Sequence, residues 1–245
     1  MDRKKLHHQK VVAGFIKNKL QEYSYFLDKV MVMCDKAARQ HYSYSAPSVG
    51  DNRALSYLFN ALTNTVQSLK DSLETATGAK IAWSRFSSVR HFLFFKESRN
   101  AMTHDGMQII DGYKEGKFYM AASMQRIDNH GNTISIDAPS ADVLTFCKQF
   151  TSDFMAVLDE IIDEREPEFP KTSLKENLQF AERTLGNGFI PDKFRDLGRN
   201  MFSEVFEQVP AELLAAEFGP VKDIKKEIAS IRAQCQGGQL SMGSH

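Results

Sequence analysis

The chain has few cysteines, no excess of charge and no long apolar run, and each shortage excludes a class of protein. Its three cysteines, Cys34, Cys147 and Cys235, are an odd number at wide spacings, which fits neither a disulfide framework nor a thiolate metal site. Lysine plus arginine and aspartate plus glutamate both number 31, so the net charge is zero. A protein without net positive charge is not expected to coat a nucleic acid or an anionic membrane through its overall electrostatic field. No window is apolar over the length of a membrane span. We therefore expect a cytoplasmic protein that binds no membrane and whose nucleic-acid contacts are local.

The chain is rich in helical periodicity. Apolar residues recur at spacings of three and four, which predicts long amphipathic helices, over residues 11–41, 51–77, 79–104 and 139–164. An acidic stretch with two prolines, residues 164–170, then marks the clearest boundary. Shorter helices are predicted beyond it, at residues 174–185, 191–206, 211–218 and 221–233. We expect a mainly α fold: an up-and-down helical bundle with a small antiparallel β insertion and an additional helical C-terminal region.

The β insertion is predicted where glycines and short alternating segments replace the helical pattern. Strands are expected at residues 107–110, 117–127 and 133–136, with a hairpin turn at residues 128–132. The domain organisation follows from these boundaries. The bundle covers residues 1–166 with the insertion at about 106–137, the helical C-terminal region covers 171–234, and a disordered tail covers 235–245.

One short segment suggests a chemistry: Arg99-Asn100-Ala101-Met102-Thr103-His104. It resembles the active-site motif of HEPN-type ribonucleases, helical bundles that are recognised by an Arg followed four to six residues later by a His, often with a polar residue directly after the Arg. Only this pair has Asn after the Arg and lies where a buried helix gives way to a glycine, at Gly106. Two other pairs have a similar spacing, Arg3 with His8 and Arg85 with His91.

The resemblance implies metal-independent RNA cleavage, with Arg99 and His104 as catalytic residues and no cofactor. An imidazole can take the proton of a ribose 2′-hydroxyl or return one to the leaving oxygen, and a guanidinium can hold the phosphoryl oxygens. Asn100 and Asp105 are assigned to substrate binding. Asp105 could also hold the tautomer of His104 or be a turn residue before Gly106. Many relatives are toxins or phage-defence effectors, which implies RNA as the substrate and a cognate antitoxin as a possible partner.

Helix geometry adds a constraint on this site. Five residues advance an undistorted helix by about 500°, so Arg99 and His104 would point about 140° apart. Either the helix ends between them, or two copies of the chain supply complementary groups. Because HEPN ribonucleases are typically dimers with paired motifs, we expect a homodimer with Arg99, Asn100 and His104 of both chains in one cleft.

Other interpretations of the segment remain open. An Arg and a His near a helix end can satisfy its last carbonyls and favour its dipole. The chain could then be a catalytically silent HEPN-like module for protein or nucleotide binding. The dipeptide His104-Asp105 also occurs in HD-type metal phosphohydrolases, for which His91 and Asp142 could be nominated as further ligands.

Overall fold

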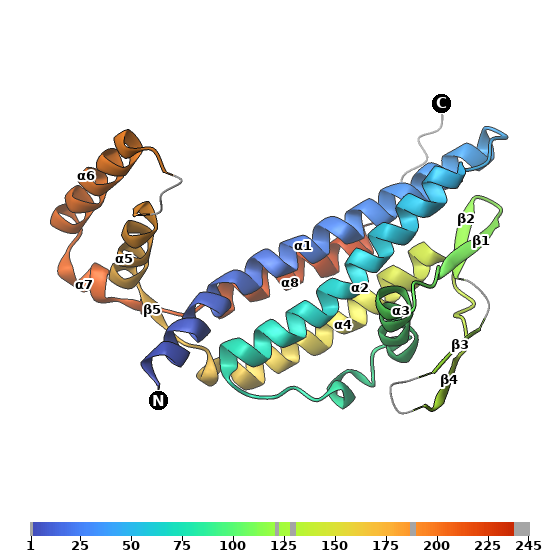
Figure 1. Cartoon of the computed structure of the whole chain (residues 1–245), viewed down its shortest axis with the longest axis horizontal. Coiled ribbons are helices and arrows are strands. Elements are labelled where there is room, and N and C mark those ends of the chain that lie inside the picture. Colours follow the sequence, from blue (N-terminus) through green and yellow to red (C-terminus); the bar gives the residue numbers. More distant parts are fainter. Residues whose placement is uncertain (1, 121–122, 128–130, 187–189, 238–245) are drawn as a thin grey trace.

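The computed structural model describes residues 2–120, 123–127, 131–186 and 190–237, and this part of the chain is mainly helical. It contains eight α-helices, two short 3-10 helices and three two-stranded antiparallel sheets (Figure 1). The expected fold class is thereby confirmed. Within these residues no helix has both the length and the apolar character that a bilayer span requires.

The longest elements are α1 (Arg3–Tyr42) and α2 (Val49–Thr77), which lie side by side as a helical hairpin (Figure 1). Local chemistry fixes both ends of α2. Ser48 and Asp51 form a reciprocal capping box that satisfies backbone N–H groups at its start. Gly78 ends it with a φ of 73°, a left-handed conformation that glycine adopts without strain.

Two further helices, α4 (Val143–Arg165) and α8 (Val221–Gln236), run along α1 and complete the bundle (Figure 1). The inner face of α8 is apolar because three isoleucines spaced by four and three are buried, Ile224, Ile228 and Ile231. The last helix of the C-terminal region therefore packs on the bundle. The expected disordered tail at 235–245 begins too early, since α8 includes residues 235 and 236, and residues 238–245 lie outside the described part.

The single helix expected over residues 79–104 is wrong. A short 3-10 helix, η1 (Trp83–Phe86), is followed by turns, and α3 (Phe92–His104) begins only afterwards. Within the turns the Ser87 hydroxyl donates to a backbone carbonyl, a bond that competes with the helical pattern. His91 then adopts a φ of 61°, which prevents a continuous helix.

The core of the bundle is largely aromatic. The parallel rings of Phe95 from α3 and Phe150 from α4 stack with centroids 3.7 Å apart. Around this pair pack other buried rings, those of Phe59, Phe146 and Phe154. α3 is thus held against α2 and α4 by apolar contacts on one face, which leaves its other faces available for polar groups.

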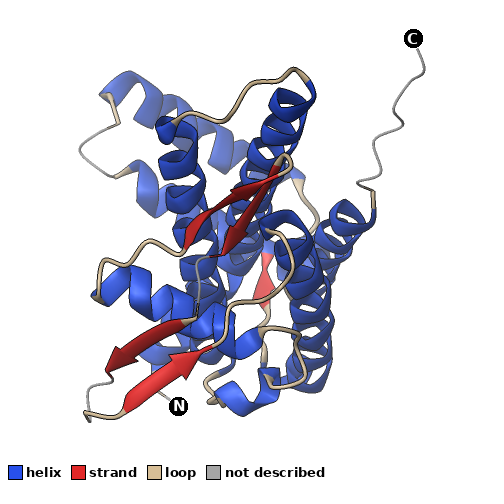
Figure 2. Ribbon diagram, turned by 90° about the vertical axis from the view of Figure 1, so that its right-hand side faces the viewer, coloured by secondary structure: helices blue, strands red, loops and turns tan. Residues whose placement is uncertain are grey.

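The inserted strands form separate hairpins, seen as small red pieces beside the helices in Figure 2. The pairs are β1 (Ile110–Lys114) with β2 (Lys117–Met120), and β3 (Met124–Ile127) with β4 (Thr133–Ile136). The first strand starts at 110 instead of 107, and the strand expected at 117–127 is divided between β2 and β3. Residues 121–122 and 128–130, which include most of the predicted hairpin turn, lie outside the described residues.

A helical excursion separates α4 from α8 and lies beyond one end of the bundle (Figure 1). After a 3-10 turn, η2 (Glu166–Glu168), it contains α5 (Leu174–Leu185), α6 (Asp192–Gln208) and α7 (Ala211–Ala215). Its two ends are joined, because β5 (Thr172–Ser173) pairs with β6 (Glu217–Phe218). No residue of α5 or α6 is fully buried.

Candidate functional site

Arg99 lies two turns into α3, and its guanidinium is held by two neutral side chains. Its Nε donates to Asn64 Oδ1 of α2 at 3.2 Å, and its Nη1 donates to Asn100 Oδ1 at 3.1 Å. The side chain is half-buried, and within the described part of the chain it forms no ion pair with a carboxylate. Amide oxygens position a guanidinium without neutralising its charge, whereas a carboxylate partner does both.

Arg99 and Asn100 line a pocket of about 100 Å³ formed by α2, η1 and α3. Lys96, whose ammonium is paired with Glu97 Oε1 at 3.0 Å, also lines the wall, and Trp83 and Phe92 add aromatic rings. The other lining residues are Thr63, Val66, Gln67 and Phe95. Cationic, amide and aromatic groups together can hold an anionic group next to a flat ring.

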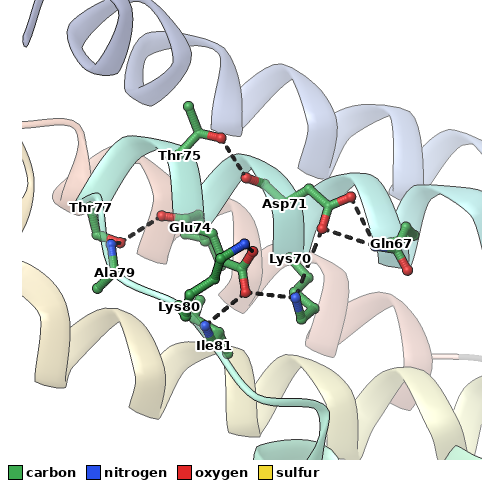
Figure 3. Close-up of polar contacts among 10 residues, drawn as sticks. Gln67, Lys70, Asp71, Glu74, Thr75, Thr77, Ala79, Lys80 and Ile81 are labelled. Carbon is green, nitrogen blue, oxygen red and sulfur yellow. Dashed lines mark hydrogen bonds and ion pairs between the residues drawn. The ribbon is translucent and has the colours of Figure 1, made fainter. Parts of the chain in front are cut away.

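Polar contacts at the end of α2 hold the segment that leads to Trp83 (Figure 3). Glu74 Oε1 accepts hydrogen bonds from Lys70 Nζ at 2.7 Å and from Ile81 N at 2.8 Å, so the segment after the helix is tied back to it. Burial alone would raise the pKa of Glu74, but the hydrogen bonds from Lys70 and Ile81 lower that pKa below its ordinary value. The Lys70 ammonium also lies 4.9 Å from the centroid of the Trp83 ring, which restrains the indole.

His104 is the last residue of α3, and its side chain is exposed. Because α3 is continuous from Phe92 to His104, the alternative in which the helix ends between Arg99 and His104 is wrong. The two side chains therefore leave the helix about 140° apart. His104 accordingly does not line the pocket that Arg99 lines.

A buried carboxylate, Glu97, organises the side of α3 that faces β3. Arg126 of β3 donates through Nη1 to Glu97 Oε2 at 3.1 Å and through Nε to Asp105 Oδ2 at 3.0 Å. Asn100 Nδ2 donates to the same Glu97 oxygen at 3.2 Å. Glu97 thereby fixes Asn100, and Asn100 in turn fixes the guanidinium of Arg99.

Asp105 lies where α3 ends, directly before Gly106, which agrees with one of its expected roles, that of a turn residue. It is the C-cap of α3, and its carboxylate pairs with Arg126, while no hydrogen bond joins it to His104 among the described residues. The structure thus brings Arg99 and Asn100 together at the pocket and leaves His104 and Asp105 at the helix end. Three polar residues that support this arrangement were not predicted from the sequence: Asn64, Glu97 and Arg126.

Glu97 gives the site an acid-sensitive anchor. Burial alone would raise the pKa of this carboxyl, but hydrogen bonds from Lys96 and Asn100 and the charges of Lys96 and Arg126 lower its pKa below the ordinary value. A carboxyl whose pKa is lower in the folded state stabilises the fold above its unfolded pKa and loses that contribution as the pH falls through the folded pKa. We expect Glu97→Gln to lower the free energy of unfolding by about 2 kcal/mol at neutral pH. As the pH falls below about 4, the variant should lose less stability per pH unit than the wild type does.

Denaturant unfolding of the wild type and Glu97→Gln at several pH values checks this expectation. Glu204→Gln on the exposed surface of α6 is the matched control and should follow the wild-type curve. If the free energy of unfolding falls equally steeply with decreasing pH in Glu97→Gln and in the wild type, this carboxyl is not the anchor.

The two other Arg/His pairs have different surroundings. Arg85 Nη2 is paired with Glu164 Oε1 at 2.7 Å, so its charge is neutralised. His91 occupies the N-cap position of α3 and precedes the helix that carries the motif. Arg3 and His8 are exposed in the first turns of α1.

The remaining alternatives can be compared with the same geometry. Arg99 donates to side-chain oxygens of Asn64 and Asn100, not to the last carbonyls of α3, as a helix-capping role would require. Asp142, nominated as a metal ligand, is the N-cap of α4 and accepts a hydrogen bond from Thr145 N at 3.0 Å. In the part of the chain that is described, no group of three or more His, Cys, Asp or Glu side chains is placed to hold a metal ion.

No protein-family model matches this chain, and neither a curated protein nor a solved structure matches it. A function is therefore inferred from the residues around α3 and from the resemblance of the segment from Arg99 to His104.

Proposed function

We propose that this protein is a metal-independent RNA endonuclease of the HEPN type, in which Arg99 and His104 act on the scissile phosphate. The observation that carries the proposal is the environment of Arg99. Its half-buried guanidinium is held by Asn64 and Asn100, lines a pocket, and is neutralised by no carboxylate of the described residues. A guanidinium in such surroundings favours phosphate oxygens as its next partners.

The chemistry assigns a separate role to each group. His104 removes the proton of the ribose 2′-hydroxyl, whose oxygen attacks the adjacent phosphorus. The bond from phosphorus to the 5′ oxygen of the next nucleotide breaks, and the protonated His104 returns its proton to that leaving oxygen. Arg99 stabilises the negative charge that builds on the phosphoryl oxygens, and Asn100 orients the guanidinium. The products are a 2′,3′-cyclic phosphate and a 5′-hydroxyl end.

The angle between Arg99 and His104 favours a site that is built from two chains. In a two-fold homodimer, Arg99 of one protomer and the partner's His104 can approach the same phosphate, which their divergence on one helix makes difficult within a protomer. We place this dimer in the cytoplasm as a toxin or phage-defence effector, with a cognate antitoxin as the protein that would block the cleft.

The first test of the proposal is a substitution of Arg99. We expect Arg99→Lys to cleave RNA about a hundredfold more slowly than the wild type, because an ammonium keeps the charge but loses the planar two-point grip on phosphate oxygens. Initial rates on labelled total RNA measure the loss, and analysis of the new ends identifies the cyclic phosphate. Arg3→Ala is the control and should cleave normally.

Addition of EDTA to the same assay should change nothing. Loss of cleavage on chelation, with recovery on adding a divalent ion, would contradict the proposal and favour a metal phosphohydrolase that uses His104 and Asp105.

The silent binding module is the second candidate, and one observation favours it. His104 does not line the pocket of Arg99, so this pocket of about 100 Å³ could hold the phosphate of a nucleotide without any proton-transfer group beside it. This candidate predicts that nucleotides bind in an Arg99-dependent manner while RNA remains intact.

A further inference from the structure

The outer face of α2 carries a row of polar side chains that leads to Arg99. Arg53, Tyr57, Asn60 and Asn64 are spaced by four, three and four residues, so they fall within about 60° of one another around the helix. A direct contact supports the common face, since Asn64 Nδ2 donates to Asn60 Oδ1 at 3.0 Å. Arg53 and Tyr57 are exposed, Tyr57 to 70%.

The row is free of negative charge. No Asp or Glu occurs between residues 52 and 70, and Arg53 has no carboxylate partner among the described residues. Arg85, Arg90 and Arg126, by contrast, are each paired with a carboxylate. An exposed cation next to an exposed aromatic ring and side-chain amides favours an anionic, ring-containing ligand.

The row meets the candidate site at Asn64. Asn64 Oδ1 accepts from Arg99 Nε at 3.2 Å and from Thr103 Oγ1 at 3.4 Å, so the polar surface continues from α2 onto α3. Residues 98–104 of α3 also contain no Asp or Glu. Figure 1 shows α2 running from the tip of the helical hairpin past α3. From Arg53 to Asn64 the helix rises by about 16 Å, enough for several groups of an extended polymer.

We propose that this surface, the α2 track of Arg53, Tyr57, Asn60, Asn64 and Thr103, binds single-stranded RNA as it leaves the phosphate held by Arg99. Tyr57 stacks on an unpaired base, Arg53 contacts a backbone phosphate, and the two asparagines and Thr103 contact sugar or phosphate oxygens. A duplex would hide the base faces from Tyr57, so the track selects single strands. The inference rests on the proposed function only for the position of the cleaved phosphate.

Binding to a strand that cannot be cleaved tests the track separately from catalysis. The probe is a short fluorescent 2′-O-methyl RNA, whose blocked 2′-oxygen prevents attack, and the readout is fluorescence anisotropy with the full chain. We expect the double variant Arg53→Ala/Tyr57→Ala to bind about tenfold or more weakly, because it loses one stacked base and one phosphate contact. The slope of log affinity against log salt should also fall by about 0.7.

The matched control removes the same two residue types from other surfaces. Tyr25 on α1 and Arg183 on α5 are both exposed, so Tyr25→Ala/Arg183→Ala should bind as the wild type does. Equal binding by the track variant and this control, while cleavage of ordinary RNA still depends on His104, would overturn the track and leave the proposed function. Binding that depends on the track, without cleavage of ordinary RNA, would support the track and overturn the nuclease.

Competition with the fluorescent probe by two other polyanions tests the class of ligand. Polyglutamate shares the negative charge of RNA but has no base to stack on Tyr57. If polyglutamate displaces the probe as efficiently as unlabelled single-stranded RNA does, RNA is not the ligand and an acidic peptide is favoured. Equal competition by a duplex of the same sequence would likewise overturn the preference for single strands, whereas weak competition by both supports it.

Discussion

We expect His104→Ala to cleave RNA about 10²–10⁴-fold more slowly than the wild type, the largest loss that any single substitution in this site should cause. His104 is the one proton-transfer group proposed for the reaction, and alanine at this position supplies no replacement. Rates on labelled, unmodified RNA measure the effect directly, with the RNA at saturating concentration so that binding does not limit the comparison.

The same substitution should leave the fold intact. The His104 side chain is exposed and makes no hydrogen bond or ion pair with another described residue, so its removal should change the free energy of unfolding by less than about 0.5 kcal/mol. His8→Ala, which removes an exposed histidine from α1, is the control for nonspecific loss of imidazole. Equal RNA cleavage by the wild type and a correctly folded His104→Ala would eliminate the catalytic role.

Periodicity predicted most of the helices because each has one apolar stripe that the fold buries. α5 begins and ends where it was expected, at residues 174 and 185, since Ser173 caps it with the aid of Glu176 and Gly186 follows it. The pattern could not predict which helices would be neighbours. An apolar stripe on α8 is equally compatible with a separate C-terminal unit, and only the three-dimensional structure shows that it contacts α1 and α4.

The region before α3 shows why the same pattern failed locally. Trp83, Phe86, Val89 and Phe92 recur at a spacing of three and are partly or fully buried, so the spacing correctly indicated their contact with the core. Their backbone nevertheless forms turns, because local serine hydrogen bonds and the left-handed conformation of His91 are compatible with the same burial. Burial and helical spacing therefore did not determine backbone conformation in this segment.

The site was only partly predictable for a similar reason. Arg99 and Asn100 are adjacent in the sequence, and a short motif can identify them. Their restraints come from far along the chain, since Asn64 lies 35 residues before Arg99 and Arg126 lies 29 residues after Glu97. One signal was available locally, because Glu97 shares a helical face with the apolar residues Phe94 and Ala101, and an acidic residue on such a face usually has charged or polar partners.

Mixing two inactive variants should restore cleavage if each phosphate is held by Arg99 of one protomer and attacked with the help of the partner's His104. In a two-fold dimer of Arg99→Ala with His104→Ala, one half-site keeps both wild-type groups and the other loses both. Random exchange makes about half of the dimers mixed, so we expect recovery of about a quarter of the wild-type rate. Each variant alone should remain inactive.

Light scattering and co-purification through a tag on one variant establish that mixed dimers have formed. The matched control mixes Arg99→Ala with Arg99→Lys, which impairs the same group in both protomers and should recover no more cleavage than Arg99→Lys alone. If mixed dimers of Arg99→Ala and His104→Ala form and remain inactive, the two groups do not combine across the interface. A protein that stays monomeric at the concentrations where it cleaves RNA would rule out the two-chain site as well, because the divergence of Arg99 and His104 along α3 would then have to be overcome within one protomer.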